Sequence, residues 1–298
     1  MRRFALAIVC VAAFAAARPC QPAGRSATTG RPALPVEHAA HTVGETITLG
    51  GREVAVWRPA GGGAAPIIVF SHGFAGCATQ STFLTRALAE AGYLVVAPRH
   101  ADAWCGGQFS LNLPAAPFWR PEEWTDASYR DRRDDIVAVL DALHRDSAFA
   151  GKIDWSKLGL LGHSLGGYTV LGLAGGWPSW RIPGVKAVVA LSPFCAPFLA
   201  AGNGLGGVTA PVEYQGGTLD IGITPVVSQR GGCYDATPAP ALYVEFRGAG
   251  HLAWTDLVAT DHASMIFYVR RFFDAWLRGQ EPGALTARRD DVADLRSK

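Results

Sequence analysis

The most informative segment of this chain is LGLLGHSLGG, which runs from Leu158 to Gly167. It begins with a mostly apolar stretch that is typical of a short buried strand, and it continues into a helical stretch at Leu165–Ala174. Ser164 lies between the two, with a glycine two residues away on either side. In this context the Gly-x-Ser-x-Gly pattern is typical of a strained turn that exposes a serine hydroxyl. We therefore expect Ser164 to be a nucleophile, with the backbone N–H of Leu165 stabilising an oxyanion.

Predicted strands and helices alternate on both sides of this segment. A hairpin is expected at 45–57, strands at 66–70, 93–97, 158–161, 185–191, 212–216 and 241–246, and helices at 79–91, 126–145, 165–174 and 263–277. This alternation predicts an α/β domain with a mostly parallel central sheet and helices on both faces. We place that single domain at residues 41–280 and a C-terminal tail at 281–298.

The first 40 residues have the features of a targeting segment and a linker. Arg2 and Arg3 precede an apolar run, and the alanines at 15–17 fit a cleavage site, so residues 1–17 are expected to be a signal peptide. Residues 18–40 are rich in Pro, Ala, Gly, Ser and Thr and are expected to form a flexible lead-in. No second apolar segment is long enough to span a membrane. These features predict a secreted or periplasmic protein.

Composition excludes several classes of protein. The 298 residues are 49% hydrophobic and 17% charged, unlike a disordered chain. The formal net charge of +2 gives no electrostatic reason to expect nucleic acid or an anionic membrane as a partner. We find no metal-ligand spacing, phosphate-binding loop or nicotinamide site, so we expect no metal and no cofactor.

Over residues 41–280 the chain resembles the α/β-hydrolases, on the strength of the strand–serine–helix motif and the alternating elements. The resemblance implies a triad in the chain order serine, acid, histidine. His251 follows the last predicted strand, where this fold carries the general base. Asp220 follows the strand at 212–216 in GGTLD, where the fold carries the acid.

Other acids and histidines compete for these roles. Asp235 lies in a proline-rich loop and Asp256 comes after His251, so Asp220 is preferred to both. His163 is adjacent to Ser164, points away from the turn in this fold, and is expected to be structural. The remaining histidines precede the serine, which is the wrong chain order, or, like His262, lie near the last helix.

The loop after the strand at 66–70 reads SHGFAG from Ser71 to Gly76 and is similar to the His-Gly-aromatic loop of α/β-hydrolases. The resemblance implies that the backbone N–H of Phe74 is the second oxyanion donor beside Leu165. His72 is expected to brace the loop.

Within the fold, the chain resembles the secreted esterases that carry no lid, both the cutinase-like polyester hydrolases and the platelet-activating-factor acetylhydrolase-like enzymes. The similarity rests on His-Gly-Phe, on GHSLGG, on Ser-Pro-Phe at 192–194 and on GAGHLAWTD at 248–256. The segment between the strands at 185–191 and 212–216, about 20 residues, is too short for a substantial lid. Phe74, Phe194 and Trp254 are candidates for an apolar substrate-binding surface; Phe194 stands where polyester hydrolases carry a tryptophan.

Four of the six cysteines lie in the expected domain, which allows three pairings. Given the fold, each of two pairs flanks neighbouring strand ends, so we expect disulfides Cys77–Cys105 and Cys195–Cys233. Cys20 lies in the lead-in and receives no role.

The sequence therefore predicts a secreted serine carboxylesterase that acts through an acyl-enzyme on short or medium acyl esters, with polyesters as a further candidate substrate, and that is a monomer. Two alternatives stay open. One is an acyltransferase or peptidase that uses the same triad, and the other is a catalytically silent binding protein on this fold.

Overall fold

The computed structural model describes residues 44–105, 108–109, 117–202, 204–258 and 262–298. These residues belong to one compact unit, Val43–Lys298. The expected signal peptide, the lead-in and Cys20 lie outside the described residues.

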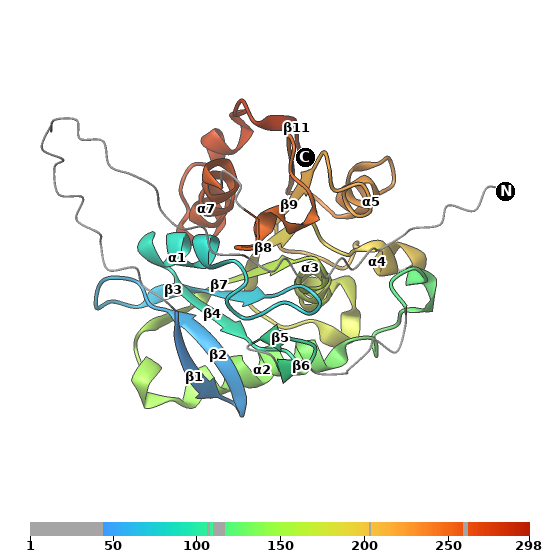
Figure 1. Ribbon diagram of the computed structural model, residues 1–298. Helices are drawn as coiled ribbons and strands as arrows, with labels where there is room; N and C mark the ends of the chain where they lie inside the picture. Colours follow the sequence, from blue (N-terminus) through green and yellow to red (C-terminus); the bar gives the residue numbers. More distant parts are fainter. Residues whose placement is uncertain (1–43, 106–107, 110–116, 203, 259–261) are drawn as a thin grey trace, which may run out of the picture. The chain divides into compact units, whose positions relative to one another are not determined.

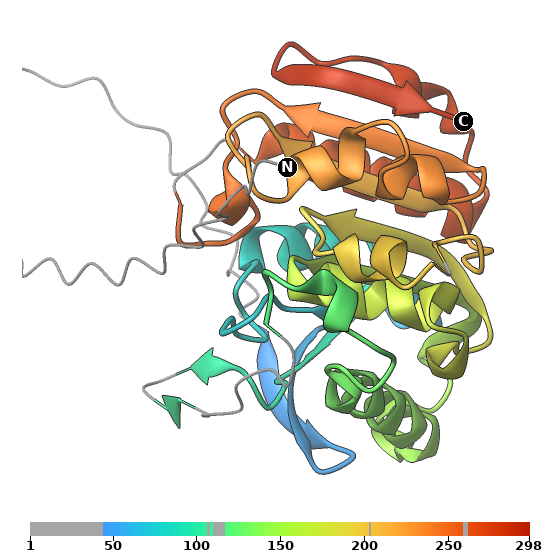
Figure 2. The same ribbon diagram turned by 90° about the vertical axis from the view of Figure 1, so that its right-hand side faces the viewer.

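A nine-stranded sheet forms the centre of this unit, in the order β1-β2-β4-β3-β7-β8-β9-β10-β11 (Figures 1 and 2). The five strand pairs from β4 to β10 are parallel, and β1, β2 and β11 are added antiparallel at the two edges. The strands are β1 (Glu45–Leu49), β2 (Arg52–Trp57), β3 (Ala65–Ser71), β4 (Leu94–Pro98), β7 (Ile153–His163), β8 (Val185–Leu191), β9 (Val212–Gly217), β10 (Ala241–Phe246) and β11 (Val292–Ser297).

Helices cover both faces because the central strands are apolar on both sides. In β3, Ile67 and Val69 join one buried cluster with side chains of α2 (Arg130–Arg145) and α3 (Leu165–Leu171). Ile68 and Phe70 point to the opposite face and join a second cluster with α1 (Thr82–Glu90) and α7 (Ala263–Arg278). This is the alternation of side chains expected of an extended strand. The expected fold class is therefore confirmed.

The shorter elements lie mainly in the loops. They are β5 (Trp104–Cys105), β6 (Gln108–Phe109), α4 (Ala196–Ala200), α5 (Thr224–Ser228), α6 (Cys233–Ala236), and short helical turns at Pro121–Glu123 (η1), Ser147–Phe149 (η2), Gly172–Gly176 (η3), Pro178–Trp180 (η4), His251–Trp254 (η5) and Pro282–Thr286 (η6). The segment between β8 and β9 carries the five-residue helix α4. No helix in the described part of the chain is long and apolar enough to cross a membrane.

The C-terminal segment differs from the expected tail. Its last strand, β11, pairs antiparallel with β10, with Val244 opposite Leu295. Arg296 also lies over the ring of Tyr243, with 4.5 Å between the guanidinium carbon and the ring centroid. The polar sequence of β11 did not indicate a strand, because an edge strand needs only one buried face.

Two disulfides join loops at the carboxyl ends of the parallel strands. Cys77 is bonded to Cys105, and Cys195 to Cys233, the two pairs expected from the sequence. The first bond ties the loop after β3 to the strand β5, and the second ties the start of α4 to α6.

Candidate active site

Ser164 occupies a sharp turn between β7 and α3. Its φ is 54°, a left-handed conformation that a residue with a side chain rarely adopts. The turn is possible because its neighbours are glycines. A Cβ atom on Gly162 would lie 2.2 Å from the carbonyl oxygen of Gly166, and one on Gly166 would lie 1.9 Å from the carbonyl oxygen of Ser71. The turn therefore presents the serine at the end of the sheet, against the loop that follows β3.

His251 and Asp220 lie beside this serine. His251 begins the helical turn η5 after β10, and its Nε2 is 2.9 Å from Ser164 Oγ. Asp220 follows β9, and its Oδ1 is 3.3 Å from His251 Nδ1. Burial by itself would raise the pKa of Asp220, but the hydrogen bond and charge of His251, with the hydroxyls of Ser192 and Thr224, lower it. Asp220 is thus held as a carboxylate behind the imidazole.

Ser192 also belongs to this group of residues, although no role was predicted for it from the sequence. Its hydroxyl donates to Asp220 Oδ2 over 2.5 Å and lies 2.7 Å from His251 Nδ1. The Ser-Pro-Phe segment contributes to the resemblance to esterases, but a serine at a strand end carries no distinct signal of a catalytic role by itself.

The loop after β3 lies against the serine. A Cβ atom on Gly73 would be 3.4 Å from the Cβ atom of Ser164, so this loop passes directly over the turn. Leu165 is the first residue of α3, and its N–H has no acceptor within the helix. The loop that carries Phe74 and the first residue of α3 therefore both lie beside the serine.

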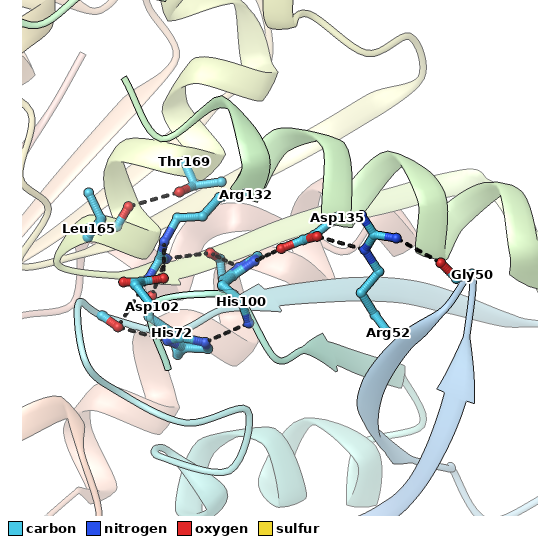
Figure 3. Close-up of polar contacts among 11 residues, drawn as sticks. Gly50, Arg52, His72, His100, Asp102, Arg132, Asp135, Leu165 and Thr169 are labelled. Carbon is cyan, nitrogen blue, oxygen red and sulfur yellow. Dashed lines mark hydrogen bonds and ion pairs between the residues drawn. The ribbon is translucent and has the colours of Figure 1, made fainter. Parts of the chain in front are cut away.

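A buried arginine holds the same loop from inside the molecule (Figure 3). Arg132 of α2 donates to the carbonyl oxygens of His72, over 2.6 Å, and Gly73, over 3.1 Å. It also forms a two-bonded ion pair with Asp102, with distances of 3.0 and 2.7 Å. His72 Nδ1 contributes a further hydrogen bond to the Gly73 carbonyl, at 2.7 Å. His72 thus braces the loop.

The polar network extends to the edge of the sheet. His100 Nε2 is 2.9 Å from Ser71 Oγ, and its Nδ1 is 2.9 Å from Asp135. Arg52 of β2 pairs with the other oxygen of Asp135 at 2.7 Å. Burial, with the charge of Arg132 as the next cause, lowers the pKa of both His72 and His100. These histidines are neutral parts of the framework.

His163, which precedes the serine, connects the loop to the triad. Its Nδ1 is 3.0 Å from Gln80 Nε2, and its Nε2 donates to the carbonyl oxygen of His251 over 2.9 Å. Gln80 in turn accepts from the backbone N–H of Gly73 at 3.0 Å. Burial, followed by the charge of His251, lowers the pKa of His163 to about 3. A neutral ring is required here, because Nδ1 accepts while Nε2 donates.

The expected apolar surface is only partly correct. Phe74 is half-buried and packs edge-on against Phe118, with 5.3 Å between the ring centroids. Phe194 is 6% exposed and is enclosed by Phe118 and Trp124, at 5.1 and 5.0 Å. Phe118, which the sequence did not single out, therefore links the two predicted phenylalanines.

The expectation for Trp254 is wrong. Its side chain is fully buried, and its Nε1 donates to Gln215 Oε1 over 2.9 Å. The short helical turn η5 exposes His251 and Leu252 but directs Trp254 into the core under α7. Trp254 is drawn inward by burial of its large ring in the cluster that includes Met265 and Tyr268 of α7 and by its hydrogen bond to Gln215, and both partners are distant in the sequence.

The competing acids have other roles. Asp256 caps α1, because its carboxylate accepts from the backbone N–H groups of Thr82 and Phe83 over 2.7 and 3.2 Å. Asp235 lies in α6 and accepts from the backbone N–H of Gly231 at 2.9 Å. His262 precedes α7 and its Nε2 is 3.1 Å from the carbonyl oxygen of Ala253.

Within the described residues, no group of three or more His, Cys, Asp or Glu side chains is suited to hold a metal ion.

Several large exposed apolar side chains are neighbours in the chain of the candidate triad residues or of Phe118. Leu219 and Ile221, on either side of Asp220, are 65% and 83% exposed, and Leu252, next to His251, is 47% exposed. Trp119, in the loop that carries Phe118, is also exposed.

Comparisons with known proteins find similarity to ester hydrolases. The sequence profile of platelet-activating factor acetylhydrolase isoform II matches residues 30–127, which include the loop at Phe74 but end before Ser164. A cutinase of Thermobifida alba is 26% identical over 237 residues, which are 77% of this chain and 68% of the cutinase. A bis(hydroxyethyl) terephthalate hydrolase of Streptomyces coelicolor is 29% identical over 141 residues, 47% of this chain and 42% of that enzyme.

The fold and these likenesses define the chain as an α/β-hydrolase. More narrowly, it is an ester hydrolase of the carboxylesterase type, similar to cutinases and to platelet-activating factor acetylhydrolases.

Proposed function

We propose that this protein is a secreted serine carboxylesterase in which Ser164 is the nucleophile, His251 the general base and Asp220 the acid that orients the base. The observation that carries the proposal is the contact between Ser164 Oγ and His251 Nε2, 2.9 Å long, with the carboxylate of Asp220 on the other side of the ring.

The chemistry follows from these positions. His251 removes the proton of Ser164 as the hydroxyl oxygen attacks the ester carbonyl carbon. The negative charge that develops on the carbonyl oxygen is stabilised by the N–H groups of Phe74 and Leu165. His251 then protonates the departing alcohol, leaving an acyl-serine. A water molecule, deprotonated by His251, attacks the acyl-serine and releases the acid.

Two features support an ester with an apolar acyl group. Leu219, Ile221 and Leu252 are exposed apolar neighbours of Asp220 and His251 in the chain, and the described residues between β8 and β9 form only one short helix. Among the relatives, cutinases and a bis(hydroxyethyl) terephthalate hydrolase are named for ester substrates. We therefore propose short and medium acyl esters as substrates and polyesters as a candidate polymer.

A second candidate function is acyl transfer or peptide hydrolysis, since an acyl-serine can also react with an alcohol or amine. A catalytically silent binding protein is a further alternative on this fold. The close contact of Ser164 with His251 favours an enzyme over the silent alternative.

The test is hydrolysis of p-nitrophenyl esters from acetyl to palmitoyl, with Ser164→Ala, His251→Ala and Asp220→Ala measured beside the wild type. We expect activity on the shorter chains, and a loss of about 10³-fold or more in kcat for the first two variants. A fluorophosphonate probe should label the wild type and not Ser164→Ala. Folded wild-type protein that neither hydrolyses the esters nor reacts with the probe would overturn the proposal. Added alcohol and amine acceptors distinguish transfer from hydrolysis by their products.

A further inference from the structure

Four neighbouring strands are each followed in the chain by one residue of a single hydrogen-bonded group. In the order β7, β8, β9 and β10, these residues are Ser164, Ser192, Asp220 and His251. Three of them are the proposed triad. The fourth, Ser192, is fully buried and lies between the acid and the base.

The distances make Ser192 the closer partner of the base. His251 Nδ1 lies 2.7 Å from Ser192 Oγ but 3.3 Å from Asp220 Oδ1. The hydroxyl of Ser192 has one proton, and it donates this proton to Asp220 Oδ2 over 2.5 Å. Its lone pairs are then directed to the Nδ1–H of His251. The acid and the base are thus connected through a hydroxyl as well as by their longer direct contact.

The backbone at Ser192 is held in an unfavourable conformation. Its φ is 42°, in the left-handed region, and its N–H donates to the carbonyl oxygen of Gln215 in β9 over 2.7 Å. A non-glycine residue in this region persists when the surrounding structure holds it, and such residues concentrate at functional sites. The strain is coupled here to a side chain that contacts two members of the proposed triad.

We propose that Ser192 is a positioning residue for His251. Its hydroxyl accepts from Nδ1–H, so that Nε2 is the nitrogen without a proton and faces Ser164 Oγ. When His251 takes the proton of Ser164, the Ser192 oxygen helps to stabilise the imidazolium, while its own proton stays shared with the Asp220 carboxylate. This inference rests on the proposed function.

The test is the pH dependence of kcat/KM for Ser192→Ala and Ser192→Gly. The glycine variant also lacks the hydroxyl but accepts a positive φ, so it guards against a folding defect in the alanine variant. We expect both to lose about 10- to 100-fold in kcat/KM, the range for a hydrogen bond to a charged group. We also expect the acid limb to move to lower pH by roughly half a unit or more, because the imidazolium is less stabilised.

Two titratable groups face His251 and could affect this acid limb. Asp220 faces the Nδ1 side of His251, and His163 faces its backbone carbonyl. His163 stays neutral over the tested range, because its pKa is about 3. Ser81→Ala is the matched control. It also removes a fully buried serine hydroxyl, one that donates to the Trp254 carbonyl at 2.6 Å, and it should leave the profile within about twofold of wild type.

A second readout does not depend on activity. NMR titration of His251 in the Ser164→Ala background should give a lower pKa when Ser192 is also replaced by glycine. In the opposite outcome, both Ser192 variants keep the wild-type kcat/KM, the wild-type acid limb and the wild-type His251 titration while Ser164→Ala is inactive. That result would overturn the role of Ser192 and leave the esterase proposal standing. If the wild type hydrolyses no ester, the esterase proposal fails, and the NMR shift alone decides whether Ser192 supports the imidazolium.

Discussion

The guanidinium of Arg132 lies 3.1 Å from the carbonyl oxygen of Gly73, inside a network in which the arginine is fully buried (Figure 3). That carbonyl belongs to the peptide unit whose N–H is contributed by Phe74. A trans peptide is planar, and its C=O and N–H point in opposite directions. An arginine that holds the carbonyl inside the molecule therefore directs the Phe74 N–H outward.

The first prediction concerns this arginine. Arg132→Met should lower kcat by about tenfold or more with little change in KM, because an oxyanion contact acts mainly in the transition state. The control is Asp102→Asn, which leaves the guanidinium bonded to the His72 and Gly73 carbonyls. It should reduce the melting temperature while kcat stays within about threefold of wild type. Equal losses of kcat in both variants would contradict a specific effect on the loop.

A buried acid gives the second prediction. Glu213 of β9 is fully buried, accepts from Gln215 at 2.7 Å through one oxygen, and has no partner for the other. Burial raises its pKa to about 8, so the folded state keeps a proton that the unfolded state loses as pH rises. Glu213→Gln should therefore stabilise the protein by about 4 kcal/mol at pH 8 and by less than about 1 kcal/mol at pH 5. Urea unfolding at the two pH values checks this; an equal gain at both would contradict it.

The third prediction concerns His163. Its lowered pKa changes the stability of the protein with pH in the direction opposite to that of Glu213. Its pKa of about 3 in the folded state means that the unfolded state binds more protons between this value and the ordinary histidine pKa. Stability is therefore lost as pH falls, by about 2 kcal/mol between pH 6.5 and pH 5 from this group alone. His163→Gln in the Glu213→Gln background, which removes the opposing slope, should flatten the pH dependence. An unchanged slope would show that His163 is protonated in the folded state.

The two disulfides should differ in their sensitivity to reduction. Cys195 and Cys233 are buried, whereas Cys77 and Cys105 are partly exposed. Mild reductant should open Cys77–Cys105 first and lower activity, because this bond ties the loop beside Phe74 to β5. Replacing Cys195 and Cys233 by alanine should cost about 3–4 kcal/mol of stability, from the 38-residue separation that the bond closes, with a smaller effect on activity. Free thiols would be alkylated at increasing reductant concentrations and located by peptide mapping, with activity measured in parallel. Opening of Cys195–Cys233 before Cys77–Cys105 would contradict the prediction.

The amino-acid sequence was sufficient for the fold class and for most of the candidate site. Ser164 is recognisable because glycines are needed at 162 and 166, where any side chain would meet backbone atoms. The apolar runs at 66–70 in β3, 158–161 in β7 and 187–191 in β8 are recognisable because a strand segment buried on both faces is apolar at successive positions. His251 and Asp220 followed from their order after these strands.

Contacts between distant segments were decided only by the tertiary structure. Ser192, Gln80 and Arg132 are ordinary residues in the sequence, and their roles arise where β8, the loop before α1 and α2 meet the ends of the parallel strands. Trp254 lies in the core because its ring packs in the cluster that includes α7 and its Nε1 donates to Gln215 of β9. The strand β11 belongs to the sheet because β10 offers it an open edge. Local sequence patterns indicate which residues are buried. The contacts between these distant residues depend instead on which strand ends lie side by side in the sheet.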